Sequence, residues 1–208
     1  MDNAPSIAGL ILAGGRGERL GGVIKSELRV GGVRLLDRVA ARLAGCRPLL
    51  VAHGRLAPEA LALGPDLVPV PDLDGDYAGP LAGLAGAIAY LAGLPEPPDL
   101  LICAAVDAPF LPQDYIARLA ASLGNHDAAL AVYDGQPYPT NAIWRVARFV
   151  DLPGRILAGT APRSLKSLTA SVDSVALDWP ASPDGDPFSN INTPEDLAEM
   201  QRRAAVSP

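Results

Sequence analysis

The chain has 208 residues, of which 49% are hydrophobic and 19% charged, a composition that fits one compact domain with a full hydrophobic core. Its net charge of −6 provides no overall positive field, which argues against a protein that binds nucleic acid or an anionic membrane. A phosphate-bearing ligand would therefore have to be held by local groups.

Targeting signals and metal or disulfide frameworks are also absent from the sequence pattern. The N-terminal segment carries an acid, no base, and a short apolar run that ends at Gly14 and Gly15, so it fits neither a signal peptide nor a membrane span. Cys46 and Cys103 lie in apolar stretches without CxxC spacing, which favours two reduced, buried thiols. We therefore expect a cytoplasmic protein.

Short apolar runs alternate with helical patterns through the first half of the chain. The expected strands span residues 7–13, 49–53, 67–70 and 100–106, and the expected helices span 35–44, lie near 58–63, and begin at Pro80. This alternation predicts right-handed crossovers and a mainly parallel sheet with helices on both faces. The loops at the carboxyl ends of those strands should carry the chemistry.

The pattern changes after Asp107. Helices are expected over residues 112–123, 165–168 and 194–203, and strands over 128–133 and 140–144. We therefore predict a mixed sheet with at least one antiparallel strand in the C-terminal half. No linker, charge block or internal repeat divides the halves, so residues 1–208 should form a single domain.

A glycine-rich loop follows the first expected strand directly, with the sequence LAGGRGERLGG from Leu12 to Gly22. Its five glycines in nine positions allow backbone N–H groups to approach a polyphosphate closely. Arg16, Arg19 and Lys25 add positive charge. The pattern is neither a Walker loop nor a dinucleotide-binding fingerprint. The alternative interpretation is a flexible surface loop with solvated arginines.

Asp107 ends the apolar central strand, in the sequence VDAPFLP. A carboxylate at the carboxyl end of a strand is well placed to hold Mg²⁺, which takes one or two carboxylates together with phosphate oxygens and water. The alternative is a turn residue or helix cap before Pro109 and Pro112.

An acidic stretch with Asp72, Asp74 and Asp76 leads into the sequence GPLAG from Gly79 to Gly83. This segment is either a loop that closes on a base and ribose, or a solvated acidic turn followed by a helix start.

Near the C-terminus, Thr193 is a natural N-cap and Asp196 an imperfect capping-box acid, so helix initiation explains much of the sequence NINTPEDL. It does not explain Asn190 and Asn192. These two amides alternate in an extended segment and should face the same side, where they could contact a substrate phosphate.

In this order and spacing, the segments LAGGRGERLGG with Lys25, GPLAG, DAPFLP, YPTNAIW from Tyr138, and NINTPEDL resemble the molybdenum cofactor guanylyltransferases, which are MobA-like nucleotidyltransferases. The resemblance covers roughly Ile7 to Arg203. It implies an α/β, Rossmann-like nucleotidyltransferase fold, and a single nucleotidyltransferase domain over residues 1–208.

The resemblance also implies roles for individual residues. By similarity, Asp107 would hold Mg²⁺ and would act with Lys25 and Arg19 in catalysis. The residues implied to bind the substrates are Leu12, Ala13, Gly14, Gly15, Lys25, His53, Asp72, Gly79, Pro80 and Leu81 on the GTP side, with Asn190 and Asn192, together with 163–166, on the molybdopterin side. The chain departs from the family in having Ile24 in place of an aspartate before the lysine, Ser26 where glycine is common, and His53 where many members have asparagine.

The implied reaction is attack by the terminal phosphate of molybdopterin on the α-phosphorus of GTP, with release of pyrophosphate. A phosphate monoester is already ionised at neutral pH, so no dedicated general base is needed, and His53 and His126 are interpreted as structural or peripheral groups. Gly14-Gly15 together with GPLAG favours GTP over CTP.

Two alternatives remain open. One is a related nucleotidyltransferase that uses CTP or another phosphorylated acceptor, and the other is a non-catalytic nucleotide-binding paralogue, for which Ile24 is the only hint. The expected partners are GTP and molybdopterin, without nucleic acid or membrane, and the resemblance allows transient contacts with molybdoenzymes or other cofactor-biosynthesis proteins.

Overall fold

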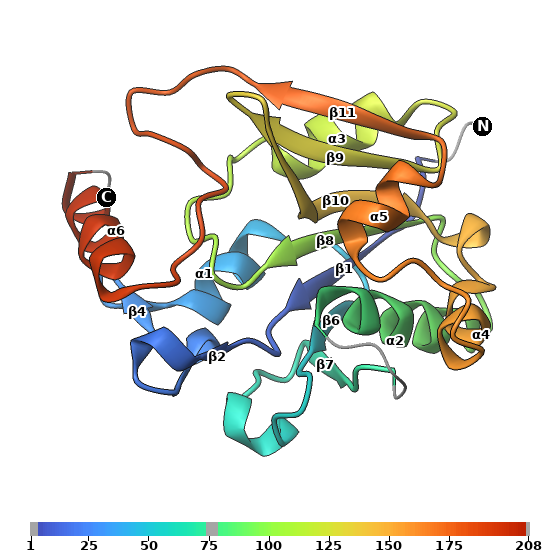
Figure 1. Cartoon of the computed structure of the whole chain (residues 1–208), viewed down its shortest axis with the longest axis horizontal. Helices are drawn as coiled ribbons and strands as arrows, with labels where there is room; N and C mark the ends of the chain where they lie inside the picture. Colours follow the sequence, from blue (N-terminus) through green and yellow to red (C-terminus); the bar gives the residue numbers. More distant parts are fainter. Residues whose placement is uncertain (1–3, 74–78, 207–208) are drawn as a thin grey trace.

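The computed structural model describes residues 4–73 and 79–206. Within them a seven-stranded sheet forms the centre of the molecule, with the strand order β11-β9-β10-β8-β1-β6-β7 (Figure 1). Its strands are β1 (Ile7–Leu12), β6 (Leu49–Ala52), β7 (Leu67–Val70), β8 (Leu100–Ala105), β9 (Ala128–Tyr133), β10 (Gln136–Arg145) and β11 (Ser174–Trp179).

Half of this sheet is parallel, as the alternation of apolar runs and helical patterns predicts. β1 pairs in parallel with β6 and with β8, and β6 pairs in parallel with β7. Every residue of β8 is buried, as expected for a central strand covered on both faces. The chain winds outward from β1 to β6 and β7, then returns to β8 on the other side of β1. The crevice beyond the carboxyl ends of β1 and β8 is therefore the expected ligand site.

The other half of the sheet is mixed, which confirms the second topological prediction. β10 is antiparallel to both β8 and β9, whereas β11 is parallel to β9. The register between β9 and β10 shifts between Tyr138 and Ala142, so the YPTN segment forms a bulge. β11 was not predicted, since this edge strand is only partly buried.

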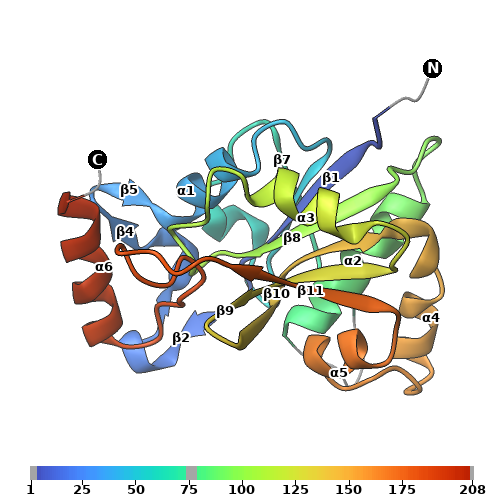
Figure 2. The same cartoon turned by 90° about the horizontal axis from the view of Figure 1, so that it is seen from above.

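Helices cover both faces of the sheet, as predicted (Figure 2). α1 (Leu35–Arg42) and α3 (Tyr115–Leu123) lie on one side, and α2 (Pro80–Ala92), α4 (Leu152–Leu157) and α5 (Leu165–Ala170) lie on the other. The two layers have separate hydrophobic cores, one containing Leu36 and Leu119, the other Leu84 and Ile88. Each fully buried aliphatic side chain contributes about 1.5–3 kcal/mol to folding.

α6 (Pro194–Val206) lies at the end of the molecule beside a small hairpin of β4 (Arg29–Val30) and β5 (Val33–Arg34) (Figures 1 and 2). Gln201 of α6 joins the two elements, because its amide donates to Arg29 O at 2.7 Å and accepts from Gly31 N at 3.0 Å. A segment near the C-terminus is thereby fixed next to the chain that follows the glycine-rich loop.

The glycine-rich loop contains short regular elements of its own. β2 (Arg16–Gly17) pairs with β3 (Val23–Ile24), and two 3₁₀ turns, η1 (Glu18–Leu20) and η2 (Lys25–Glu27), complete it. Elsewhere, η4 (Val146–Arg148) follows β10.

Two predicted helices need correction. The helix expected near 58–63 is the 3₁₀ turn η3 (Pro58–Leu61), which ends because Ala62 adopts the left-handed conformation with φ 42°. The helix expected from residue 112 starts at Tyr115, after a turn in which Tyr115 N donates to Pro112 O.

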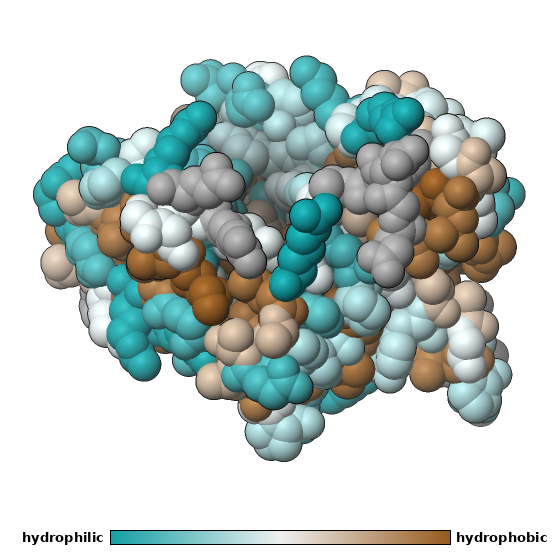
Figure 3. Space-filling model, turned by 60° about the horizontal axis from the view of Figure 1, so that its bottom comes forward, coloured by the Kyte–Doolittle hydropathy of each residue, from teal (hydrophilic) through white to brown (hydrophobic). Residues whose placement is uncertain are grey.

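The outer surface mixes hydrophilic and hydrophobic groups, as the face in Figure 3 shows. In the described parts of the chain, no helix has both the length and the apolar character needed to cross a bilayer. Cys46 and Cys103 are free and buried, as predicted, and burial raises the pKa of both thiols, to about 11 for Cys46.

Candidate active site

Lys25 and Asp107 meet in the crevice beyond the carboxyl ends of β1 and β8. Asp107 lies two residues after β8 and Lys25 begins η2, and Lys25 Nζ lies 2.6 Å from Asp107 Oδ2. The two side chains are only 11% and 14% exposed, so water screens the pair little. The structure thus brings together the cation and the carboxylate that the sequence analysis selected from separate motifs.

Asn190 and Asn192 enclose this ion pair from the other side. Asn192 Oδ1 accepts a hydrogen bond from Lys25 Nζ at 2.8 Å. With its amide nitrogen turned toward the neighbouring acceptors, Asn190 donates to Asp107 Oδ1 at 3.3 Å. The backbone N–H of Ile191 donates to Asp107 O at 3.1 Å. The prediction that both amides face one side is therefore confirmed, and that side is the Lys25–Asp107 pair.

The start of α6 fixes Asn192. Asp196 Oδ2 accepts from the backbone N–H groups of Asn192 and Thr193, each at 2.8 Å, and Thr193 Oγ1 accepts from Asp196 N at 3.2 Å. These bonds, above all the one from Asn192, lower the pKa of Asp196. The Asp196 side chain reaches the backbone ahead of the helix, so it completes the reciprocal capping that the sequence suggested.

On the other side of the crevice, the first loop and the end of β6 are in backbone contact. A Cβ added to Gly14 would lie 2.8 Å from both Cα and N of Gly54, closer than real Cβ atoms approach. Gly54 itself has φ 59°, a conformation that favours glycine. Both positions therefore need the absence of a side chain.

Asp72 lies beside this contact. Its Oδ1 accepts from Gly54 N at 3.2 Å, and a Cβ on Gly83 in α2 would lie 3.3 Å from the same oxygen. Burial raises the pKa of Asp72, although the Gly54 hydrogen bond and the neighbouring His53 oppose that shift. Gly14, His53 and Asp72, which come from three separate segments of the chain, are thus neighbours. Asp74 and Asp76 lie outside the described residues.

Other predicted site residues serve the fold with their side chains or N–H groups. His53 is 9% exposed, and its Nδ1 lies 2.7 Å from Leu56 O, which can only accept, so Nδ1 is the donor. Ala13 is fully buried, and its N–H donates to Ala52 O. Leu81 is 1% exposed, so its side chain belongs to the core. For Ala13 and Leu81, only the remaining backbone groups are left for a ligand.

Four further predicted residues lie at the ends of regular elements or in the loops beside them: Leu12, Gly15, Gly79 and Pro80. Gly79 precedes α2 with φ 79°, and Pro80 is the first helical residue. Leu12 is half-buried at the end of β1, and Gly15 is exposed in the loop. The loop that runs from Leu12 to Gly15 carries backbone N–H groups beyond the carboxyl end of β1.

No hydrogen bond between described residues joins Arg19, Ser164 or Lys166 to the pair of Lys25 and Asp107. Arg19 is exposed in η1, and no bond between described residues ties it to Lys25 or Asp107. Ser164 caps α5 through a reciprocal bond with Ser167, and Lys166 is exposed in that helix. Their roles remain predictions.

Two residues that support the site were missed by sequence reasoning. Gly54 directly follows a predicted strand, and its place at the carboxyl end of that strand was the available signal. Asn141, in the YPTN bulge, is fully buried, and its Oδ1 accepts from Ala105 N at 3.2 Å, which supports the end of β8 just before Asp107. A buried amide is only recognisable once the bulge is seen.

Comparison with known proteins identifies the family. The profile of the MobA-like NTP transferase domain matches residues 9–175. The chain belongs to this family. A molybdenum cofactor guanylyltransferase of Bradyrhizobium sp. (strain ORS 278) is 38% identical over 97% of this chain and 94% of that protein. One of Rhodobacter capsulatus is 37% identical over 95% and 96% of the two chains.

Solved structures with less than 25% sequence identity share the fold. Molybdopterin-guanine dinucleotide biosynthesis protein A from Archaeoglobus fulgidus superposes with a TM-score of 0.73 at 22% identity, over 96% of this chain and 99% of that one. A 2-C-methyl-D-erythritol 4-phosphate cytidylyltransferase from Thermus thermophilus gives 0.66 at 19% identity, over 96% and 99%. Since proteins named for guanine and for cytosine nucleotides share this fold, the fold alone does not select the base.

Proposed function

We propose that this member of the MobA-like family is a molybdenum cofactor guanylyltransferase. It transfers GMP from GTP to the terminal phosphate of molybdopterin and releases pyrophosphate. The observation that carries the proposal is the cluster of Lys25, Asp107 and Asn192, in which three separate motifs meet at the topological switch point of the sheet. Full-length similarity to proteins named molybdenum cofactor guanylyltransferase supports the choice of substrates.

The surroundings of Asp107 fit Mg²⁺ that is bound together with substrate. No group of three or more His, Cys, Asp or Glu side chains that could hold a metal occurs in residues 4–73 and 79–206, so a metal cage made by the protein alone is not available there. Mg²⁺ needs only one or two carboxylates when phosphates and water supply the other ligands. Asp107 already faces a cation, the Lys25 ammonium, at 2.6 Å. When bound, Mg²⁺ would neutralise charge on the donor phosphates.

The protein's own contribution is positioning and charge neutralisation. The acceptor phosphate is ionised without help, so a general base is not required. Lys25 is placed to exchange its partner Asp107 for phosphate oxygens and to stabilise the charge that develops as pyrophosphate leaves. Backbone N–H groups of the loop that contains Gly14 and Gly15 add fixed dipoles of the right sign. Asn190 and Asn192 orient the acceptor side.

Guanine selectivity belongs to the backbone contact between Gly14 and Gly54. Two backbones that touch without side chains leave room beside them for a purine, and Asp72 lies next to this contact. Backbone groups that pair with guanine would lose those hydrogen bonds when another base binds, which penalises the wrong nucleotide. We therefore propose GTP as the preferred donor.

A substrate panel tests the proposal. The purified protein is incubated with molybdopterin, Mg²⁺ and each of the four ribonucleoside triphosphates, and dinucleotide and pyrophosphate are quantified. The expected result is a guanine dinucleotide and one pyrophosphate per turnover with GTP. Equal or better use of CTP would overturn the base assignment and keep the reaction class. Nucleotide binding without any pyrophosphate release would instead favour the non-catalytic paralogue.

A further inference from the structure

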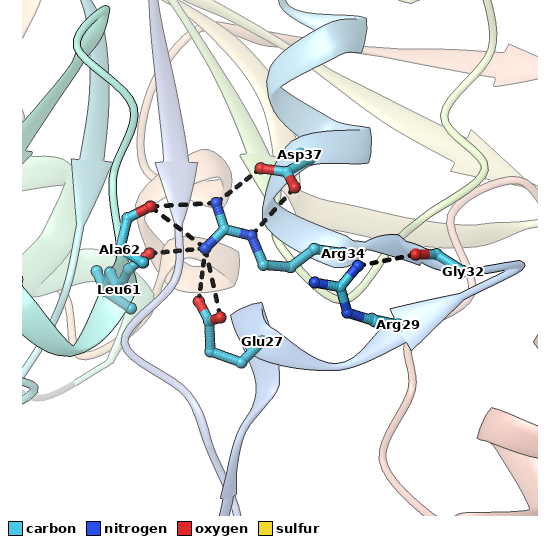
Figure 4. Close-up of polar contacts among 7 residues, drawn as sticks. All are labelled: Glu27, Arg29, Gly32, Arg34, Asp37, Leu61 and Ala62. Atoms are coloured by element: carbon cyan, nitrogen blue, oxygen red, sulfur yellow. Dashed lines mark hydrogen bonds and ion pairs between the residues drawn. The ribbon is translucent and has the colours of Figure 1, made fainter.

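Arg34 lies outside every motif discussed above, yet its guanidinium is fully engaged (Figure 4). Nε and Nη2 donate to the two carboxylate oxygens of Asp37 at 3.1 and 2.7 Å. Nη1 donates to Glu27 Oε1 and to Leu61 O, each at 3.0 Å, and both terminal nitrogens reach Ala62 O at 3.3 Å. The side chain is only 11% exposed, so this hub joins three segments that are separate in the sequence.

The first of these segments is the turn that carries Lys25. Glu27 is the last residue of η2, which Lys25 begins, and a single 3₁₀ turn has little stability of its own. No side chain caps the turn at Ile24, and Ser26 is buried with its hydroxyl unpaired among the described residues. The bond between Glu27 and Arg34 is therefore a second polar side-chain anchor of the lysine-bearing turn, besides the bonds that Lys25 itself makes to Asp107 and Asn192.

The second segment leads back to the nucleotide side of the crevice. Leu61 ends η3 and Ala62 follows it, within the connection that starts at His53 and Gly54, and His53 bonds to the same connection at Leu56 O. Gly54 is the residue whose backbone touches Gly14. Arg34 thus links the turn of Lys25 to the loop that supports the first glycine pair.

The third segment is the first turn of α1, which contributes Asp37. This carboxylate is the largest cause that raises the pKa of Arg34, and Glu27 adds to the effect. Asp37 fixes the guanidinium to the helix, and no hydrogen bond or ion pair between described residues joins it to the lysine-bearing turn. The two carboxylates therefore hold the same arginine with different consequences for the crevice.

We propose that Arg34 is a positioning residue of the active site. Through Glu27 it holds the turn of Lys25 at a fixed distance from the His53–Gly54 loop, so that Lys25 Nζ is directed at the phosphates of the bound nucleotide. The inference rests on the proposed function, in which Lys25 binds those phosphates. Arg34 acts through Lys25 and touches no reacting atom.

The test compares Glu27→Ala with its matched control Asp37→Ala. Each variant removes one carboxylate partner of Arg34, but only the first releases the lysine-bearing turn. Calorimetric titration with GTP alone gives the dissociation constant, and thermal denaturation reports the fold. We expect Glu27→Ala to bind GTP roughly three- to thirtyfold more weakly, which lies within the range of interaction energies between coupled neighbours. Asp37→Ala should melt at a lower temperature and keep its GTP affinity.

A double-mutant cycle separates positioning from general destabilisation. In a Lys25→Ala background the positioning account predicts that Glu27→Ala has no further effect on GTP binding, because there is no lysine left to direct. An equal loss of affinity in both backgrounds, or unchanged affinity for Glu27→Ala in the wild-type background, would overturn it. Glu27→Gln provides the same readout if the alanine variant does not fold.

The same titrations distinguish failure of the positioning role of Arg34 from failure of the proposed phosphate site at Lys25. If Lys25→Ala weakens GTP binding and Glu27→Ala does not, the positioning role fails and the proposed site remains. If Lys25→Ala itself binds GTP like the wild type, the proposed phosphate site fails, and the role of Arg34 fails with it.

Discussion

Replacing Gly14 with alanine tests the backbone contact on which the nucleotide side of the site depends. The added Cβ would lie 2.8 Å from Gly54 Cα and N and 3.2 Å from the carbonyl carbon of His53, all of them backbone atoms that cannot rotate away. Restoring ordinary contact at about 3.4 Å requires the two loops to separate by about 0.6 Å. If the loop of Gly54 is the one that moves, its hydrogen bond to Asp72, now 3.2 Å, is the contact next to it that can be lost.

The expected cost follows from those distances. Forcing an extra methyl group into a closely packed contact costs about 1–3 kcal/mol, and in a chain of this size each kcal/mol lowers the melting temperature by about 2–4 °C. The displaced loop should also lose at least one hydrogen bond to a charged phosphate, worth about 1.5–3 kcal/mol, which weakens GTP binding tenfold or more. Thermal denaturation and GTP titration measure the two effects.

Gly15→Ala is the control for this prediction. A Cβ on Gly15 would meet only the flexible Lys25 Cδ, at 3.6 Å, and the residue has no positive φ. Its melting temperature should therefore stay close to that of the wild type. If Gly14→Ala also melted and bound GTP like the wild type, the two loops would not be in the contact described, and the reasoning about the purine site would be refuted.

Four further substitutions probe the crevice. Lys25→Ala should weaken GTP binding and slow transfer together, because the lysine neutralises phosphate charge before and during the reaction; unchanged titration and kinetics would remove the loop as the phosphate site. Asp107→Asn should preserve the fold and reduce turnover severely, since an amide lacks the charge that holds Mg²⁺; wild-type turnover at limiting Mg²⁺ would contradict this. Burial raises the pKa of Asp72, so the folded state binds its proton more tightly than the unfolded state, and the stability gained in acid is lost as the pH rises through the raised pKa. The melting temperature of Asp72→Asn should therefore be higher than that of the wild type at pH 7.5, and the difference should vanish below about pH 4. A lower melting temperature at pH 7.5 would show that another contact of Asp72 dominates. Thr193→Ala should cost about 1 kcal/mol through loss of the helix cap, measurable by chemical denaturation, and an unchanged unfolding midpoint would exclude the cap.

The elements with a regular apolar pattern could be predicted from the sequence, and those without one could not. The strands 67–70 and 128–133 were predicted with the bounds that the structure shows, because each is a short run of apolar residues with breaks on both sides. α4 was missed, since Pro153 and Gly154 interrupt its pattern although proline is tolerated in the first turn. β11 was missed because an edge strand with alternating partial burial has no continuous apolar run.

The candidate site could be predicted as a set of residues but not as a network. Lys25, Asp107 and Asn192 each stood out in a motif, and the rule that strand ends share one edge of a parallel sheet applied to the loop with Lys25 and to Asp107. The direct contact between Lys25 and Asp107, 82 positions apart, and the bond from Lys25 to Asn192, which the cap of α6 fixes, are visible only in the fold. Arg34 gave no signal, because a charged residue in a short hairpin is ordinarily solvated and only the fold brings it to Leu61 and Ala62, 27 and 28 positions away.

Isotope tracing tests the central claim most directly, because guanylyl transfer breaks one particular bond of GTP. The protein is incubated with molybdopterin, Mg²⁺ and GTP labelled either at the α- or at the γ-phosphorus, and products are separated. The account predicts that the α-label appears in a molybdopterin guanine dinucleotide and the γ-label in pyrophosphate, in equal amounts. Recovery of the γ-label as inorganic phosphate or on the acceptor, with no α-label in a dinucleotide, would contradict it.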